Sequence, residues 1–109
     1  MRTLSFNVKG QIIERDPSCD FSGIVAGTKG YLAAKFSFSP DWDGCSKVVG
    51  FFSKTGEEFT PCTLSDRGTC AIPDEAAALH EFEIRVYGKK NGCIIPTRPI
   101  TIKQYGGTK

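Results

Sequence analysis

The sequence predicts an antiparallel β-sandwich of about seven to nine short strands with one short helix near residues 74–80. Three observations predict this fold: apolar and polar residues alternate with a period of two, turn residues recur at short intervals, and no strand–helix–strand rhythm is present. The same pattern is typical of a small barrel, so it leaves open whether the sheet closes on itself. With 109 residues the chain can bury one core. We therefore expect one domain over residues 1–105 and a frayed tail over residues 106–109.

The clearest alternation lies in the first half of the chain. Residues 3–8 (TLSFNV) and 31–38 (YLAAKFSF) carry apolar side chains at every second position, which predicts strands with one buried face. Residues 47–53 (KVVGFFS) are apolar on both faces, which predicts a central or doubly covered strand. Residues 16–23 are irregular and are expected to form an exposed loop.

The middle of the chain adds two short strands and the only helix. Residues 57–64 (EEFTPCTL) follow a short glycine-containing turn, and Pro61 places this strand at a sheet edge because proline has no amide donor. Residues 69–73 (TCAIP) form the next predicted strand. Residues 73–81 (PDEAAALHE) combine a proline and an aspartate suited to a first helical turn with three alanines, which predicts the helix.

The last third of the chain predicts a hairpin. Residues 82–88 (FEIRVYG) alternate again, and the pair Asn91-Gly92 that follows is the strongest local hairpin signal because both residues tolerate positive φ. Residues 93–105 form the closing strand, which two prolines interrupt.

Composition and charge are those of an ordinary globular protein. Apolar residues make up 39% of the chain and charged residues 24%. The net charge of +2 is interspersed, which gives no basis for nucleic-acid binding. No apolar run resembles a signal peptide or reaches transmembrane length, so we expect no membrane association and maturation in a reducing cytosol.

The cysteines are predicted to be reduced thiols packed as small core or strand residues. Their odd number, wide spacing and lack of a CxxC motif argue against a disulfide framework and against a zinc site. The five are Cys19, Cys45, Cys62, Cys70 and Cys93. We predict no cofactor and no metal.

The only tryptophan, Trp42, stands between Asp41 and Asp43 in the segment PDWDG. One interpretation is a turn that folds the indole over the end of the core, which the large area of tryptophan favours. A second is an exposed aromatic that a partner recognises. A third is a cation site, although calcium takes six or more oxygen ligands and only two carboxylates are present locally.

Basic residues cluster along the predicted C-terminal hairpin. Lys89 and Lys90 accompany Tyr87 there, and such a group can contact phosphate or an acidic partner, or keep sheet edges from pairing with other chains. The candidate binding residues of the chain are therefore Trp42, Asp41, Asp43, Tyr87, Lys89 and Lys90.

His80 is the only histidine. With a cysteine it could form a nucleophile–base pair, but no oxyanion loop or third orienting group is identifiable. We expect His80 to cap the C-terminal end of the predicted helix, where the helix dipole favours a cation. The chain is predicted not to be an enzyme.

The order of these features is informative as a whole. The segments VKGQIIERD, YLAAKFSFSPDWDG, KVVGFF, CAIPDEAAALHEFEIRVYG and IIPTRPITI follow one another over almost the whole chain. This order resembles a family of small immunoglobulin-like β-sandwich proteins and modules encoded by phages and prophages of Firmicutes. The resemblance implies a non-enzymatic domain associated with virion appendages such as tail, baseplate or head-fibre proteins. It supplies no catalytic residues.

Two functions are compatible with this resemblance. The first is a virion decoration or appendage protein whose partners are phage structural proteins or further copies of itself, with the virion as its location. The alternative is a small soluble inhibitor that binds a host defence protein during infection. The first predicts recovery with virions or a symmetric homo-oligomer, and the second predicts that a host protein co-purifies with the chain.

Overall fold

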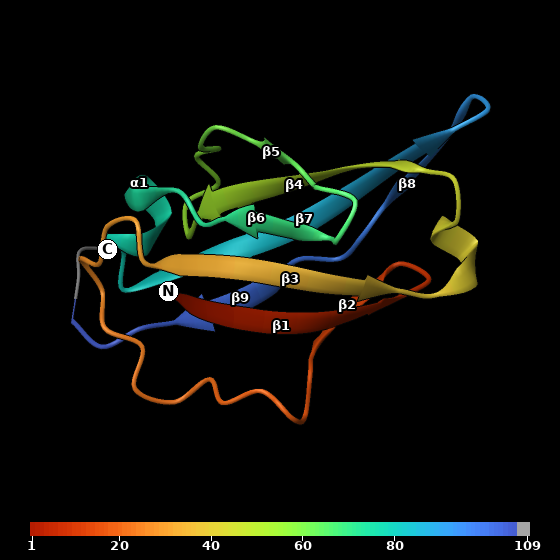
Figure 1. Ribbon diagram of the computed structural model, residues 1–109. Helices are drawn as coiled ribbons and strands as arrows, with labels where there is room; N and C mark the ends of the chain where they lie inside the picture. Colours follow the sequence, from red (N-terminus) through yellow and green to blue (C-terminus); the bar gives the residue numbers. More distant parts are fainter. Residues whose placement is uncertain (107–109) are drawn as a thin grey trace.

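The computed structural model describes residues 1–106 and shows two β-sheets packed face to face (Figure 1). One sheet has four strands, in the order β2 (Ile12–Arg15), β1 (Arg2–Lys9), β3 (Leu32–Phe38) and β6 (Thr69–Ala71). The other has five: β5 (Cys62–Thr63), β4 (Ser46–Ser53), β7 (Glu81–Lys90), and then β8 (Cys93–Pro96) and β9 (Ile100–Lys103), which both pair with β7. The predicted all-β sandwich is confirmed, and the two separate sheets distinguish it from a closed barrel.

One strand pair departs from the predicted antiparallel arrangement. β1 and β3 run parallel, with Leu4 opposite Ala34. A parallel pair needs a long crossover, and residues 16–31 supply it by running along the lower edge of the sandwich in Figure 1. This crossover loop is tied to the other sheet by a hydrogen bond from the Tyr105 amide to the carbonyl oxygen of Ile24, 2.8 Å long.

The core lies between the two sheets and follows the predicted alternation. Most inward residues of β1, β3, β4 and β7 are almost completely buried, and the ring of Phe6 meets that of Phe36 edge-on at 5.2 Å between centroids. Complete burial of one such aliphatic or aromatic side chain contributes about 1.5–3 kcal/mol to folding. The fully buried side chains of largest volume are Trp42, Phe6, Phe51, Phe82, Leu4, Ile84, Ile102, Val8, Val49 and Val86.

Two local predictions are confirmed. Pro61 directly precedes β5, which is a terminal strand of its sheet, although β5 covers only Cys62–Thr63 of the strand predicted over residues 57–64. Asn91 and Gly92 form the turn between β7 and β8 with φ angles of 49° and 81°, the left-handed conformation that this hairpin needs.

The helix is shorter than its sequence predicts. α1 covers only Asp74–Ala77, followed by β7 from Glu81. The carbonyl oxygens of Ala77 and Leu79 accept hydrogen bonds from the Gln104 side-chain amide, at 3.1 and 2.7 Å. A side chain from the C-terminal segment thus takes the place of donors that a longer helix would supply.

All strands between residues 1 and 106 belong to this one sandwich. Of the predicted tail, residues 107–109 lie outside the described residues. None of the helices between residues 1 and 106 is long and apolar enough to span a membrane.

Candidate protein-interaction surface

Trp42 closes one end of the core. It lies in η1, a single 3₁₀ turn over Pro40–Trp42, and none of its side chain is exposed. The indole Nε1 donates a 2.8 Å hydrogen bond to the carbonyl oxygen of Gly10, and the ring packs on that of Phe38 at 5.2 Å. The packing interpretation of Trp42 is therefore confirmed. The exposed-aromatic interpretation is wrong, because a partner cannot reach a fully buried ring.

The two aspartates beside Trp42 are both exposed, but they contact different parts of the molecule. The main-chain carbonyl oxygen of Asp43 accepts a 2.7 Å hydrogen bond from the ammonium group of Lys90, whereas Asp41 lines a shallow hollow. Within residues 1–106, no three His, Cys, Asp or Glu side chains are grouped so that they could hold a metal ion.

The η1 corner and the β7–β8 hairpin lie at the same end of the sandwich, on the right in Figure 1. The Lys90–Asp43 hydrogen bond joins them. The β1–β2 turn is bound to the same end, because the Gln11 side-chain amide donates a 2.9 Å hydrogen bond to the carbonyl oxygen of Pro96. The hollow between these segments measures about 380 Å³ and has Ile94 on its rim. Three segments far apart in sequence therefore build one fixed end of the molecule.

The outer face of the five-stranded sheet is apolar near this end. Directly paired residues of neighbouring strands share a face, and Tyr87 pairs with both Val48 and Pro96, while Lys89 pairs with Ile94. These five residues, Val48, Tyr87, Lys89, Ile94 and Pro96, are called the hairpin face. Ile94 is its most prominent apolar member, with 68% of its surface exposed.

The hairpin face rests on a closely packed base. A Cβ atom on Gly50 would lie 2.8 Å from the ring of Phe52 and 3.3 Å from that of Tyr87, so both rings lean over the bare backbone of this glycine. The guanidinium of Arg85 lies 5.4 Å from the centre of the Phe52 ring, within cation–π range. The rings of Phe52 and Tyr87 therefore cover the backbone of Gly50 beside the hairpin face.

The predicted binding residues divide between two places. Tyr87 and Lys89 belong to the hairpin face, whereas Lys90, Asp41, Asp43 and the buried Trp42 belong to the corner behind it. Val48, Ile94 and Pro96 were missed because their common face depends on the register of three strands. The signal that pointed to Val48 was the segment KVVGFFS, in which both faces are apolar and one of them faces solvent.

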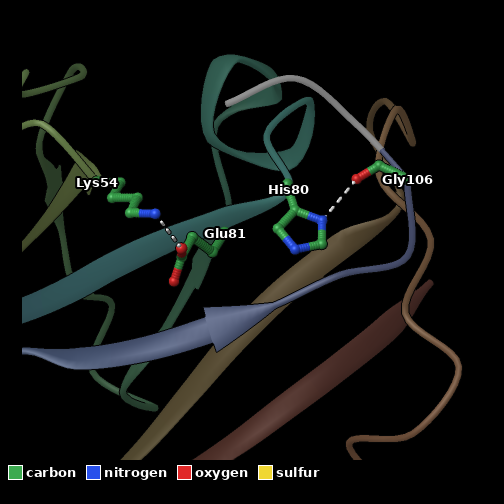
Figure 2. A network of polar contacts seen from close by, with 4 residues as sticks. All are labelled: Lys54, His80, Glu81 and Gly106. Atoms are coloured by element: carbon green, nitrogen blue, oxygen red, sulfur yellow. Dashed lines mark hydrogen bonds and ion pairs between the residues drawn. The ribbon is translucent and has the colours of Figure 1, made fainter.

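His80 lies beyond the helix, so the prediction that it caps the helix is wrong. The C-cap residue is Ala78, and His80 stands directly before β7. Figure 2 shows His80 and Glu81 pointing in different directions: the His80 Nδ1 atom lies 3.1 Å from the carbonyl oxygen of Gly106, and Glu81 lies 3.4 Å from the ammonium group of Lys54. Both contacts tie the start of β7 to neighbouring segments.

The five cysteines are free thiols, as predicted. Cys45, Cys62 and Cys70 pack against the core, while Cys93 is exposed on β8. Burial, with a smaller contribution from the neighbouring thiol of Cys62, raises the pKa of Cys70 to about 12. Cys70 is therefore a protonated packing residue at neutral pH.

Comparison with known proteins finds no matching family model, no matching curated protein and no matching solved structure.

Proposed function

We propose that this chain is a non-enzymatic, phage-encoded module of a virion, a decoration or appendage protein that attaches to its protein partner through the hairpin face. The observation that carries the proposal is the 68% exposure of Ile94 between Tyr87 and the hairpin tip. A large aliphatic side chain on a rigid strand is the kind of anchor that dominates protein–protein interfaces. The order of segments in the sequence supports the virion setting, through its resemblance to phage β-sandwich modules.

The chemistry of the hairpin face describes the partner surface. An apolar recess on the partner would cover Ile94, Val48 and Pro96. Complete burial of the Ile94 side chain contributes up to about 1.5–3 kcal/mol to binding. Lys89 stands beside Ile94 and favours an acidic rim around that recess. The partner is thus expected to combine an apolar pocket with a negatively charged border.

Ile94→Asp tests this proposal, with Ile12→Asp as the matched control. Ile12 is also exposed, at 49%, but it pairs with Lys9 on the outer face of the other sheet. In cells producing the phage, the tagged wild-type chain and the Ile12→Asp variant should be recovered with purified virions. The Ile94→Asp variant should be depleted at least about tenfold, since it places a charge in the apolar centre of the contact.

Two results contradict the proposal. Equal recovery of both variants excludes the hairpin face as the attachment surface. Absence of the chain from purified particles, with capture of a host protein by the tagged wild type, favours the alternative function as a host-directed inhibitor.

A further inference from the structure

Lys47 stands at an inward-facing position of β4, where the neighbouring inward side chains belong to the core. The inward residues of β4 include Val49 and Phe51, both with no exposed surface, and Lys47 stands at the next inward position toward the η1 corner. Its register partner is Gly88, whose inner side is covered by Trp42. The lysine side chain therefore enters the space between the two sheets.

Among the described residues, the ammonium group of Lys47 has a single hydrogen-bond acceptor. It donates one 3.3 Å hydrogen bond to the carbonyl oxygen of Cys45 and lies 5.1 Å from the centre of the Phe38 ring. Within residues 1–106 the only ion pair joins Lys54 and Glu81, so no described carboxylate lies within 4.0 Å of Lys47. An ammonium group has three donors, and a half-buried one attracts an anion to complete its hydrogen bonds.

Lys47 lines a hollow of about 460 Å³. Phe36 and Phe38 form its apolar side, and the turn between β5 and β6 forms its rim, including Asp66 and Arg67. This volume lies within the range of small-molecule sites. The hollow is called the Lys47 cavity.

The rim of the Lys47 cavity is anchored to β3. Gly68 accepts a 2.8 Å hydrogen bond from the Phe36 amide, and a Cβ atom on Gly68 would lie 2.5 Å from the Phe36 carbonyl oxygen. With φ at +74° as well, only glycine fits this position without strain. The turn that carries Arg67 therefore keeps a fixed place beside the cavity.

We propose that the Lys47 cavity binds a small organic anion with an aromatic or other apolar body. Lys47 and Arg67 contribute two positive charges against one negative charge from Asp66, which favours a carboxylate or phosphate group. The exposed part of the Phe38 ring is the surface on which the apolar body packs. This site lies between the sheets, separate from the hairpin face, and does not depend on the proposed virion function.

Phenyl phosphate and inorganic phosphate are the probes for this proposal, with amide chemical shifts in ¹H–¹⁵N NMR spectra of the isotope-labelled protein as the readout. Phenyl phosphate should shift the amides of Lys47, Leu64 and Arg67 in a saturable manner. Inorganic phosphate should shift the same amides but bind at least about tenfold more weakly, because it has no apolar body to pack on Phe38.

Lys47→Met and Arg67→Gln should each weaken phenyl phosphate binding by about tenfold or more, the usual effect of losing a charge-assisted hydrogen bond. Lys54→Met is the matched control and should bind like the wild type, since Lys54 is exposed and directly follows β4 at the end remote from Lys47. The dispersion of the NMR spectrum shows for each variant whether the protein is folded. Arg67→Gln should not disturb folding, because Arg67 lies on an exposed turn outside the core.

Shifts that are scattered over the molecule, or wild-type binding by both Lys47→Met and Arg67→Gln, would overturn the proposal. Equal affinities for phenyl phosphate and inorganic phosphate would overturn the assignment of an apolar body.

Discussion

The indole ring of Trp42 lies directly on the backbone of Gly88: a Cβ atom at residue 88 would come within 2.5 Å of the ring. The η1 corner and the central strand β7 thus pack with no side chain between them. This contact fixes the end of the sandwich from which both the hairpin face and the Lys47 cavity are built.

Gly88→Ala should destabilise the protein by about 1–3 kcal/mol, the usual cost of forcing an extra methyl group into a filled core. The free energy of unfolding in urea measures this cost. Gly50→Ala is the matched control, because its added methyl group meets the half-buried ring of Phe52, which can turn toward solvent. A smaller loss in Gly88→Ala than in Gly50→Ala would contradict the close packing of Trp42.

Trp42→Ala should lower the free energy of unfolding by about 3–5 kcal/mol, as expected for an aromatic residue removed from a core. Trp42→Phe should lose less, about 1–3 kcal/mol, since it keeps an aromatic ring near Phe38 but leaves the Gly10 carbonyl oxygen without its donor. Denaturant unfolding of the two variants gives both values. A nearly unchanged stability in Trp42→Ala would show that the indole does not support the core.

The thiols should react in an order set by exposure and pKa. With its pKa raised to about 12, Cys70 is ionised to only about one part in ten thousand at pH 8, whereas Cys93 is exposed. Brief treatment of the native protein with Ellman's reagent, followed by peptide mass mapping, should find Cys93 modified first and Cys70 last. Cys93→Ser should remove the fast phase, and modification of Cys70 as rapid as that of Cys93 would contradict its burial.

Acid should loosen the first part of the crossover loop. The Ser18 amide and hydroxyl, which donate to the Asp16 carboxylate at 2.9 and 2.8 Å, lower the pKa of that group below 3.8. Because folding lowers this pKa, the bonds stabilise the loop above pH 3.8 and are lost as the pH falls through the lower, folded-state value. The amide shift of Ser18 should titrate in that range, and Asp16→Asn should abolish the titration. A flat wild-type curve would contradict these hydrogen bonds.

The strands and the hairpin could be predicted from sequence because their signals are local. Alternation in the segments around Phe6 and Phe36 and the positive φ of Asn91-Gly92 depend on neighbouring residues only. The parallel pairing of β1 with β3 could not be predicted, because it depends on where the crossover loop takes the chain. The predicted helix is too long, because the side-chain amide of Gln104, 27 residues further along the chain, donates to the Ala77 carbonyl oxygen at the end of the helix.

Some residues of the candidate sites could be predicted from the sequence and others could not. Tyr87 and Lys89 stood out because basic and aromatic residues follow one another along the chain. Ile94 and Val48 join them only through strand register, which the sequence does not encode locally. Lys47 went unnoticed because KVVGFFS is apolar on both faces, so the pattern alone does not show that its lysine points inward.

The central position of β7 has a consequence for synthesis on the ribosome. β4, β8 and β9 all pair with β7, which ends at Lys90, so the five-stranded sheet cannot assemble before most of the chain has been translated. β1 must likewise wait for β3 before it gains its parallel neighbour. Such long-range pairing delays folding relative to locally paired proteins. The five-stranded sheet should therefore form only once the residues up to Lys103 have left the ribosome, and until then the apolar strands that pair with β7 stay unpaired.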